Sequence, residues 1–266
     1  IHLFCGGATG QVPSAQSGPH GEIIVRHCSG MGNIYAGSIS TDGKDNSSSI
    51  PATVTMIDME DDYKMGEFYA CGALQTPVDS NHLFDMDYVV APPTPSTEHF
   101  PVTGDVTFNL YYTSTSMVDG TTGGTKNATV TYTANGSLNE GLTLKNLSSL
   151  TVGSGGNLTP TVDSVLDDST KLAVSPSSVL NLTNLTSPVF SSFQGGGDLV
   201  LGQTQTLTIS GSVSGTTRIG IGAIQVSGSR DVPKIGHTYI SAPNSTDGNF
   251  ELICQGNNLD MKLVRD

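Results

Sequence analysis

Short stretches of this chain alternate apolar and polar residues with a period of two. The pattern is clearest in "VTFNLYY", residues 106 to 112, where Val106, Phe108 and Leu110 alternate with Thr107 and Asn109. Successive side chains of a β-strand point to opposite faces, so one face packs inward and the other meets water. Since "NATVTYTAN" and "QTQTLTISGSV" repeat the pattern, the sequence predicts strands along much of its length.

The first hundred residues favour short strands separated by turns. We expect strands at residues 22–28, 33–40, 52–59, 67–74 and 82–91, with turn residues in "STDGKDNSSS" and "QTPVDSN". The last 36 residues return to strands in "HTYISA", "NFELICQG" and "LDMKLVRD". Residues 162–169 have helical spacing of apolar positions and predict one short helical turn, and no internal repeat with a solenoid or propeller period is evident.

A proline-rich stretch, "APPTPSTEHFP" at residues 91–101, separates two styles of sequence. Its four prolines in eleven residues remove backbone donors and favour an extended spacer. We therefore expect an all-β fold, with two modules of antiparallel β-sandwich type joined by a Pro-rich hinge. The predicted parts are an acidic, cysteine-containing β module at 1–91, to which we assign binding, a Thr-rich β-sandwich at 102–230, and C-terminal strands at 231–266 that pack back on the first module.

The acidic composition of the chain argues against some classes of binding partner. The chain has 266 residues, 62 of them Ser or Thr, and a net charge of −13. Residues 1–100 hold 12 acids against 3 bases, and phosphate contacts need clustered Lys and Arg. We expect no nucleic-acid partner. We also expect no membrane insertion, because no apolar run approaches the roughly 18 residues of a membrane span.

Four cysteines, Cys5, Cys28, Cys71 and Cys254, are widely spaced and form no CxxC pair. This spacing predicts two disulfides, and with them an exported, extracellular or cell-surface protein whose signal segment is absent from this chain. Four cysteines allow three pairings. We favour Cys5–Cys28 with Cys71–Cys254, which makes residues 101–230 an insertion into a module built from both chain ends.

Eight Asn-x-Ser/Thr sequons are present, beginning at Asn46, Asn127, Asn135, Asn146, Asn157, Asn181, Asn184 and Asn244. A chain rich in Asn, Ser and Thr also generates such triplets by chance. Glycosylation in a secretory route and accidental occurrence both stay open.

The acidic run "IDMEDDYKMGEF" and the nearby "FDMDY" supply candidate ligand residues. Asp58, Glu60 and Asp62 share a face if the first strand continues, and Asp85 and Asp87 share a face on another. Converging carboxylates could hold calcium, whereas a solvated acidic face that protects a strand edge is the alternative. We expect no other cofactor. Aromatic faces with a polar tip suit saccharides or protein partners, so the predicted ligand-binding set is Asp58, Glu60, Asp62, Tyr63, Asp85 and Asp87.

No short catalytic motif is present, and we expect a protein that is not an enzyme. Its overall style, with the Pro-rich joint at residues 91–101 and the alternating "VTGDVTFNLYY" and "LTISGSV" strands, resembles bacterial fimbrial tip adhesins and minor pilus subunits. The resemblance implies attachment to a host-cell receptor or glycan and contacts with other pilus or fibre subunits. The alternatives are a phage or viral receptor-binding spike, a structural coat or fibre subunit, and a secreted glycosidase that would use Asp58, Glu60, Asp85 and Asp87.

Overall fold

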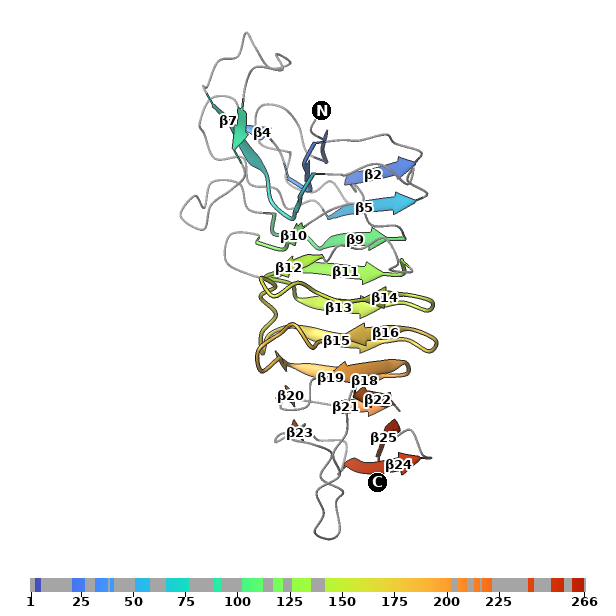
Figure 1. Ribbon diagram of the computed structural model, residues 1–266. Coiled ribbons are helices and arrows are strands. Elements are labelled where there is room, and N and C mark those ends of the chain that lie inside the picture. Colours follow the sequence, from blue (N-terminus) through green and yellow to red (C-terminus); the bar gives the residue numbers. More distant parts are fainter. Residues whose placement is uncertain are drawn as a thin grey trace. The chain divides into compact units, whose positions relative to one another are not determined.

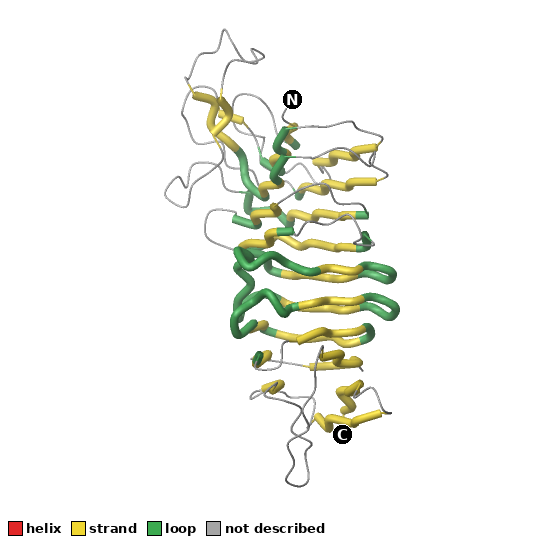
Figure 2. Tube along the Cα trace, in the orientation of Figure 1, coloured by secondary structure: helices red, strands yellow, loops and turns green. Residues whose placement is uncertain are grey.

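The computed structural model describes residues 3–5, 21–26, 32–37, 39–40, 51–57, 66–76, 89–91, 102–111, 117–121, 126–134, 142–201, 205–209, 213–215, 217–221, 239–241, 250–255 and 260–265. These residues form strands and turns and include no helix (Figure 2). Accordingly, no helix in this part of the chain could cross a membrane. The helical turn predicted at 162–169 is wrong, because the stretch forms two tight turns closed by bonds from Ser164 N to Thr161 O and from Thr170 N to Asp167 O.

The chain divides into two compact units. Unit 1 consists of Ile1–Val130 with Leu144–Ser148, and unit 2 consists of Thr131–Thr143 with Ser149–Asp266. Each unit is described by itself.

Unit 1 contains the strands β1 (Leu3–Phe4), β2 (Gly21–Arg26), β3 (Ile34–Tyr35), β4 (Ile39–Ser40), β5 (Ala52–Ile57), β6 (Phe68–Tyr69), β7 (Ala73–Thr76), β8 (Val89–Ala91), β9 (Val106–Leu110) and β10 (Met117–Asp119). The strands β11 (Ala128–Tyr132) and β12 (Thr143–Lys145) each lie partly in it. Two sheets carry most of these strands, in the orders β1-β3-β6-β10 and β2-β5-β9-β11. Successive strands of the first sheet are parallel, as are β2, β5 and β9 in the second (Figure 1).

The chain of unit 1 visits these two sheets in turn, so each pass adds one strand to each sheet. That path is a parallel β-solenoid. Its coils are unequal, since Gly21 is in register with Ala52, and Ala52 with Val106. The small sheet β4-β7-β8 lies on the longer connections and contains one antiparallel pair, β7 with β8.

Unit 2 contains β13 (Ser149–Val152), β14 (Asn157–Leu158), β15 (Lys171–Val174), β16 (Val179–Asn181), β17 (Val189–Phe190), β18 (Ser192–Gly195), β19 (Asp198–Leu201), β20 (Thr206–Ile209), β21 (Val213–Gly215), β22 (Thr217–Ile221), β23 (Tyr239–Ser241), β24 (Phe250–Gln255) and β25 (Asp260–Arg265). Three parallel ladders hold all of these strands except β24 and β25, namely β13-β15-β18-β21, β14-β16-β19-β22 and β17-β20-β23. Paired residues follow one another at short, similar intervals, as Asn157, Val179 and Asp198 do. Unit 2 is therefore also a parallel β-solenoid, with shorter and more regular coils than unit 1.

An antiparallel hairpin ends the second ladder of unit 2. Strand β25 pairs antiparallel with β22 on one side and with β24 on the other. The hairpin thereby covers the edge of β22, which would otherwise offer unpaired backbone groups to another chain. The predicted packing of residues 231–266 on the first module stays a prediction.

The predicted pair of antiparallel β-sandwiches is wrong, although the all-β character is right. The dominant pairing is parallel, and the antiparallel pairs β7-β8, β22-β25 and β24-β25 form no sandwich. The Pro-rich stretch does not separate two sheets, because β5 and β9, on either side of it, are hydrogen-bonded neighbours. The absence of a solenoid repeat was also a wrong expectation, since coils of unequal length hide the period.

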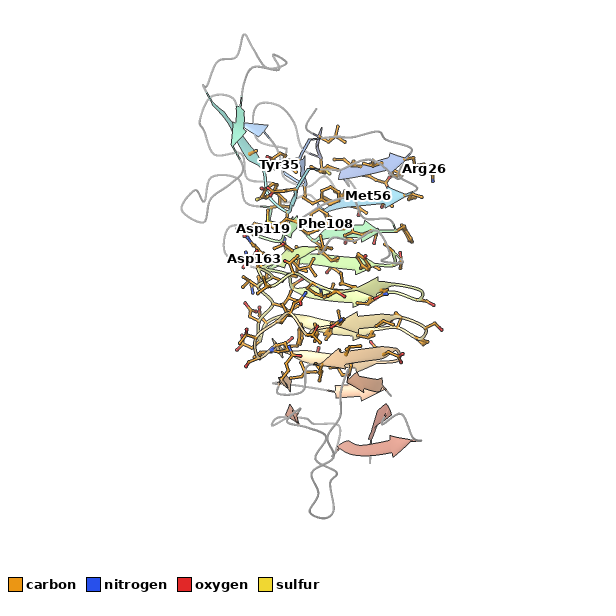
Figure 3. All side chains as sticks on the ribbon, viewed as in Figure 1. Arg26, Tyr35, Met56, Phe108, Asp119 and Asp163 are labelled. Atoms are coloured by element: carbon orange, nitrogen blue, oxygen red, sulfur yellow. The ribbon has the colours of Figure 1, made fainter. Side chains whose placement is uncertain are left out.

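Large apolar side chains fill the interior of unit 1. Val54, Met56 and Phe108 are fully buried on the inward faces of β5 and β9, and Figure 3 labels Met56 and Phe108. The rings of Phe68 on β6 and Phe108 on β9 lie 6.0 Å apart, centre to centre. Since those strands belong to different sheets, this contact joins the two walls of the coil.

Unit 2 repeats the same principle with smaller side chains. Leu158, Leu180 and Leu199 are in register on successive strands, and all three are fully buried. Gly197 lies at a turn so tight that a Cβ there would stand 2.4 Å from Ser175 O. The stack of leucines and the glycine turn together set how closely the coils approach.

A three-residue motif shapes several turns of both units. The Oδ1 atoms of Asp119, Asp167 and Asn181 each accept hydrogen bonds from the backbone N–H and the hydroxyl of the residue two positions on. These are Asx turns, which give a corner its bend through a local side-chain acceptor.

Candidate binding face

The outward side of the sheet β2-β5-β9-β11 in unit 1 forms a regular array of mostly uncharged side chains. We call it the hydroxyl face, and its members are Glu22, Ile24, Arg26, Thr53, Thr55, Ile57, Thr107, Asn109, Tyr111 and Thr129. It arises directly from the alternation in the sequence, because β5, β9 and β11 all alternate buried with half-buried residues. The prediction that one face of "VTFNLYY" meets water is confirmed for residues 106–111.

The parallel register places these side chains in rows across the strands. One row runs from Glu22 through Thr53 to Thr107, and the next from Ile24 through Thr55 to Asn109. A bond from Val106 N to Asn127 O (3.2 Å) continues the register and places Thr129 beside Thr107. Neighbouring strands lie about 4.8 Å apart, and alternate residues of a strand about 6.6 Å apart, so the face is a two-dimensional grid.

The uncharged polar groups of this grid can both donate and accept hydrogen bonds. A hydroxyl has one donor and two acceptor lone pairs, and an amide has two donors and a carbonyl acceptor. One cross-strand bond, from Asn109 Nδ2 to Thr55 Oγ1, is long at 3.4 Å. A bond of this kind leaves further hydrogen-bonding capacity on both groups for a ligand.

Two large apolar side chains stand on the same face. Ile24 is 51% exposed and Tyr111 is 53% exposed, and Tyr111 stays in the ladder because its N–H donates to Met56 O at 3.1 Å. Val162 and Val165, the other exposed large apolar residues among those described, lie in a turn of unit 2. The hydroxyl face therefore combines a polar grid with an exposed aromatic ring.

Comparison with protein-family models, curated proteins and solved structures gives no match.

The predicted acidic ligand set lies outside the described residues. Asp58, Glu60, Asp62, Tyr63, Asp85 and Asp87 are all in this position, so their role and the calcium site stay predictions. Among the residues that the structure describes, no group of three or more His, Cys, Asp or Glu is placed to hold a metal ion.

The cysteines are only partly described. Cys5 and Cys71 are free thiols in the structure, and burial raises the pKa of each to about 12. Cys28 and the side chain of Cys254 lie outside the described residues. The two predicted disulfides stay predictions.

A second cluster, on β3 and β6, is buried. The Tyr35 and Tyr69 rings stack with centres 5.1 Å apart, Asn33 Nδ2 donates to Tyr35 Oη at 3.1 Å, and Tyr69 Oη donates to Glu67 Oε2. Burial, the foremost cause, raises the pKa of Tyr35 to about 12 and also raises the pKa of Tyr69. Because both rings are at most 4% exposed, this cluster stabilises the coil and offers no surface to a ligand.

Some of the sequon asparagines are hydrogen-bonded within the fold, and another is exposed. The Asn127 amide donates to Val102 O at 2.8 Å and to Gly104 O, and the Asn146 amide donates to Asp119 Oδ1 and Thr121 Oγ1. Both amides therefore hold corners of unit 1 together. In the folded chain their nitrogens serve the fold, whereas Asn157 on β14 is exposed.

The residue that the sequence predictions left out is Tyr111. The predicted ligand set has Tyr63 as its aromatic residue and includes no residue of β9. The available signal was the alternation itself, which puts Tyr111 on the outward face together with Thr107 and Asn109.

Proposed function

We propose that this protein is an extracellular surface-binding protein of the adhesin type, and that it attaches through the hydroxyl face of unit 1. The observation that carries the proposal is the grid of in-register threonines with the exposed ring of Tyr111 beside it. The hydrogen-bonding side chains of this face stand on a fixed backbone. They therefore lose little conformational entropy when a ligand binds, which favours recognition. Threonine side chains are also stiff at χ1, which limits that loss further.

A parallel solenoid is a suitable scaffold for such attachment. Each coil fixes the next through continuous backbone ladders, so the outward residues hold their spacing without help from a ligand. Extended surfaces of this kind are what repetitive solenoids use for binding. The function itself rests on the chemistry of the face, because an architecture does not specify one.

Binding of the purified full chain to target cells tests the proposal. Thr107 lies at the centre of the grid, and Thr107→Lys places a long charged side chain across it without disturbing the interior. We expect at least a tenfold loss of cell binding, equivalent to about 1.4 kcal/mol. Ser154→Lys, at an exposed position of unit 2 that belongs to no sequon, is the matched control and should bind like the wild type. Equal binding by both variants and the wild type would overturn the proposal.

A further inference from the structure

The chemistry of the hydroxyl face specifies a class of ligand. We propose that it binds a neutral polysaccharide whose chain follows strand β9 from Thr107 through Asn109 to Tyr111, flanked by the threonines of β5, with a sugar ring stacked on Tyr111. This inference rests on the proposed function and deepens it.

The polar half of the argument is the match between threonine, asparagine and sugar groups. Every sugar hydroxyl is both a donor and an acceptor, as are the threonine hydroxyls, and the Asn109 amide supplies donors and an acceptor together. Groups of fixed polarity, such as carboxylates or ammonium groups, would satisfy only half of those contacts. A row such as Thr53–Thr107–Thr129 repeats the dual-polarity group once for each strand.

The apolar half is Tyr111. A tyrosine ring has an apolar face and a polar tip, and at 53% exposure it leaves part of its surface open. The C–H face of a pyranose ring can cover that surface while the ring hydroxyls turn to the threonines. Ile24, 51% exposed on β2, provides a second apolar position on the same side.

The geometry favours a polymer over a single sugar. Outward residues of β9 repeat at about 6.6 Å along the strand, so a chain that follows β9 meets Thr107, Asn109 and Tyr111 in succession. Several weak contacts that engage together give an avidity that one sugar would not reach. We therefore expect binding to strengthen with the length of the oligosaccharide.

The charges favour a neutral polymer. The part of the face on β5 and β9 carries no ionisable side chain apart from the phenol of Tyr111, and the two charged members, Glu22 and Arg26, lie on β2 with opposite signs. An acidic polysaccharide would find no cationic cluster on this face. It would also approach a chain with a net charge of −13, which disfavours association.

The test is affinity electrophoresis of the full chain in gels containing neutral glucan, mannan or galactan, with alginate as the acidic comparison. We expect retardation by at least one neutral polysaccharide. Tyr111→Ala should weaken it about tenfold, Tyr111→Phe less than about threefold because the ring stays, and Thr107→Val about threefold to tenfold through the loss of one hydroxyl. Ser154→Ala, which removes an exposed hydroxyl of unit 2 outside the sequons, is the matched control, and unchanged thermal unfolding verifies that each variant is folded.

The outcomes separate this inference from the proposed function. Cell binding that is lost in Thr107→Lys, without retardation by any neutral polysaccharide and without loss after enzymatic removal of surface glycans, would overturn the polysaccharide and leave the adhesin proposal standing. Stronger retardation by alginate would overturn the neutral class. Retardation that Tyr111→Ala leaves unchanged would overturn the assigned site.

Discussion

Asn127 illustrates how one side chain holds a corner of the solenoid. Its amide nitrogen donates to the backbone carbonyls of Val102 and Gly104. Both residues come just before strand β9. The Asn127 Oδ1 is buried without a hydrogen-bond partner. The two hydrogen bonds from the Asn127 nitrogen offset the desolvation cost of its unpaired oxygen. Asn127 therefore has a structural role in unit 1.

Asn127→Ala should lower the free energy of unfolding by about 1–3 kcal/mol, because two carbonyl groups lose their donor. Asn157→Ala, at an exposed position of β14, is the control and should change the free energy by less than about 0.5 kcal/mol. Urea unfolding of the wild type and both variants measures the difference. Equal midpoints for the two variants would show that the Asn127 bonds do not support the fold.

Cys71 gives the chain a pH dependence at alkaline pH. Burial raises the pKa of its thiol from 9.0 to about 12, so the folded state favours the neutral thiol more than the unfolded state does. That contribution is fully present below pH 9 and is lost as the pH rises towards 12. We expect the stability of the wild type to fall over this window.

Cys71→Ala should show a shallower fall with pH, since it lacks this group while Cys5 and Tyr35 keep theirs. Urea midpoints measured between about pH 8 and about pH 10.5 give the two slopes. Parallel slopes for the variant and the wild type would contradict the assignment to Cys71.

At the level of single elements, the sequence predicted the strands at 52–59 and 106–112 correctly, whereas the predicted strands at 33–40 and 67–74 each form two shorter strands in different sheets. The expected strand at 52–59 corresponds to β5 (Ala52–Ile57), and the alternation at 106–112 corresponds to β9 (Val106–Leu110). Alternation tells which side chains face inward, and it is the same for parallel and antiparallel neighbours. The direction of pairing depends on which strands become neighbours in the sheet. The spacing of short strands along the sequence does not reveal that.

Leu180 on β16 tests the leucine stack of unit 2. Leu180→Ala removes a fully buried side chain between Leu158 and Leu199, and should cost about 2–5 kcal/mol of unfolding free energy. Val179→Ala, a half-buried neighbour on the same strand, should cost less than about 1 kcal/mol. Thermal and urea unfolding compare them, and a similar cost for both would mean that the leucine row is not the core of the coil.

For the whole molecule, the irregular coil length explains why the solenoid was missed. Register partners in unit 1 are as far apart as Ala52 and Val106, whereas Val179 and Asp198 in unit 2 are much closer. Equivalent inward positions also differ in residue type, as Leu172 and Phe193 do. The coils repeat in their geometry but not in their length or in their residues. Such a repeat is hard to detect in a single sequence. The predicted ligand set includes no member of the hydroxyl face, although the outward alternation on β9 already marks Thr107 and Asn109 in the sequence.

The hairpin of β24 and β25 makes a prediction at the same scale. Strand β25 is hydrogen-bonded on both sides, with Leu263 in register with Thr217 of β22 and Leu252 of β24. Leu263→Pro removes a backbone donor and strains the strand, so the hairpin should leave β22. The uncovered edge then offers its backbone to another copy.

We therefore expect Leu263→Pro to form concentration-dependent oligomers, measured by size-exclusion chromatography with light scattering. Leu263→Ala keeps the backbone donor and is the matched control, which should elute like the wild type at the same concentration. Adding Thr217→Pro to Leu263→Pro blocks the exposed edge itself and should reduce the association. A monomeric Leu263→Pro with wild-type circular dichroism would show that the edge of β22 needs no cover, and that the hairpin does not act as a cap.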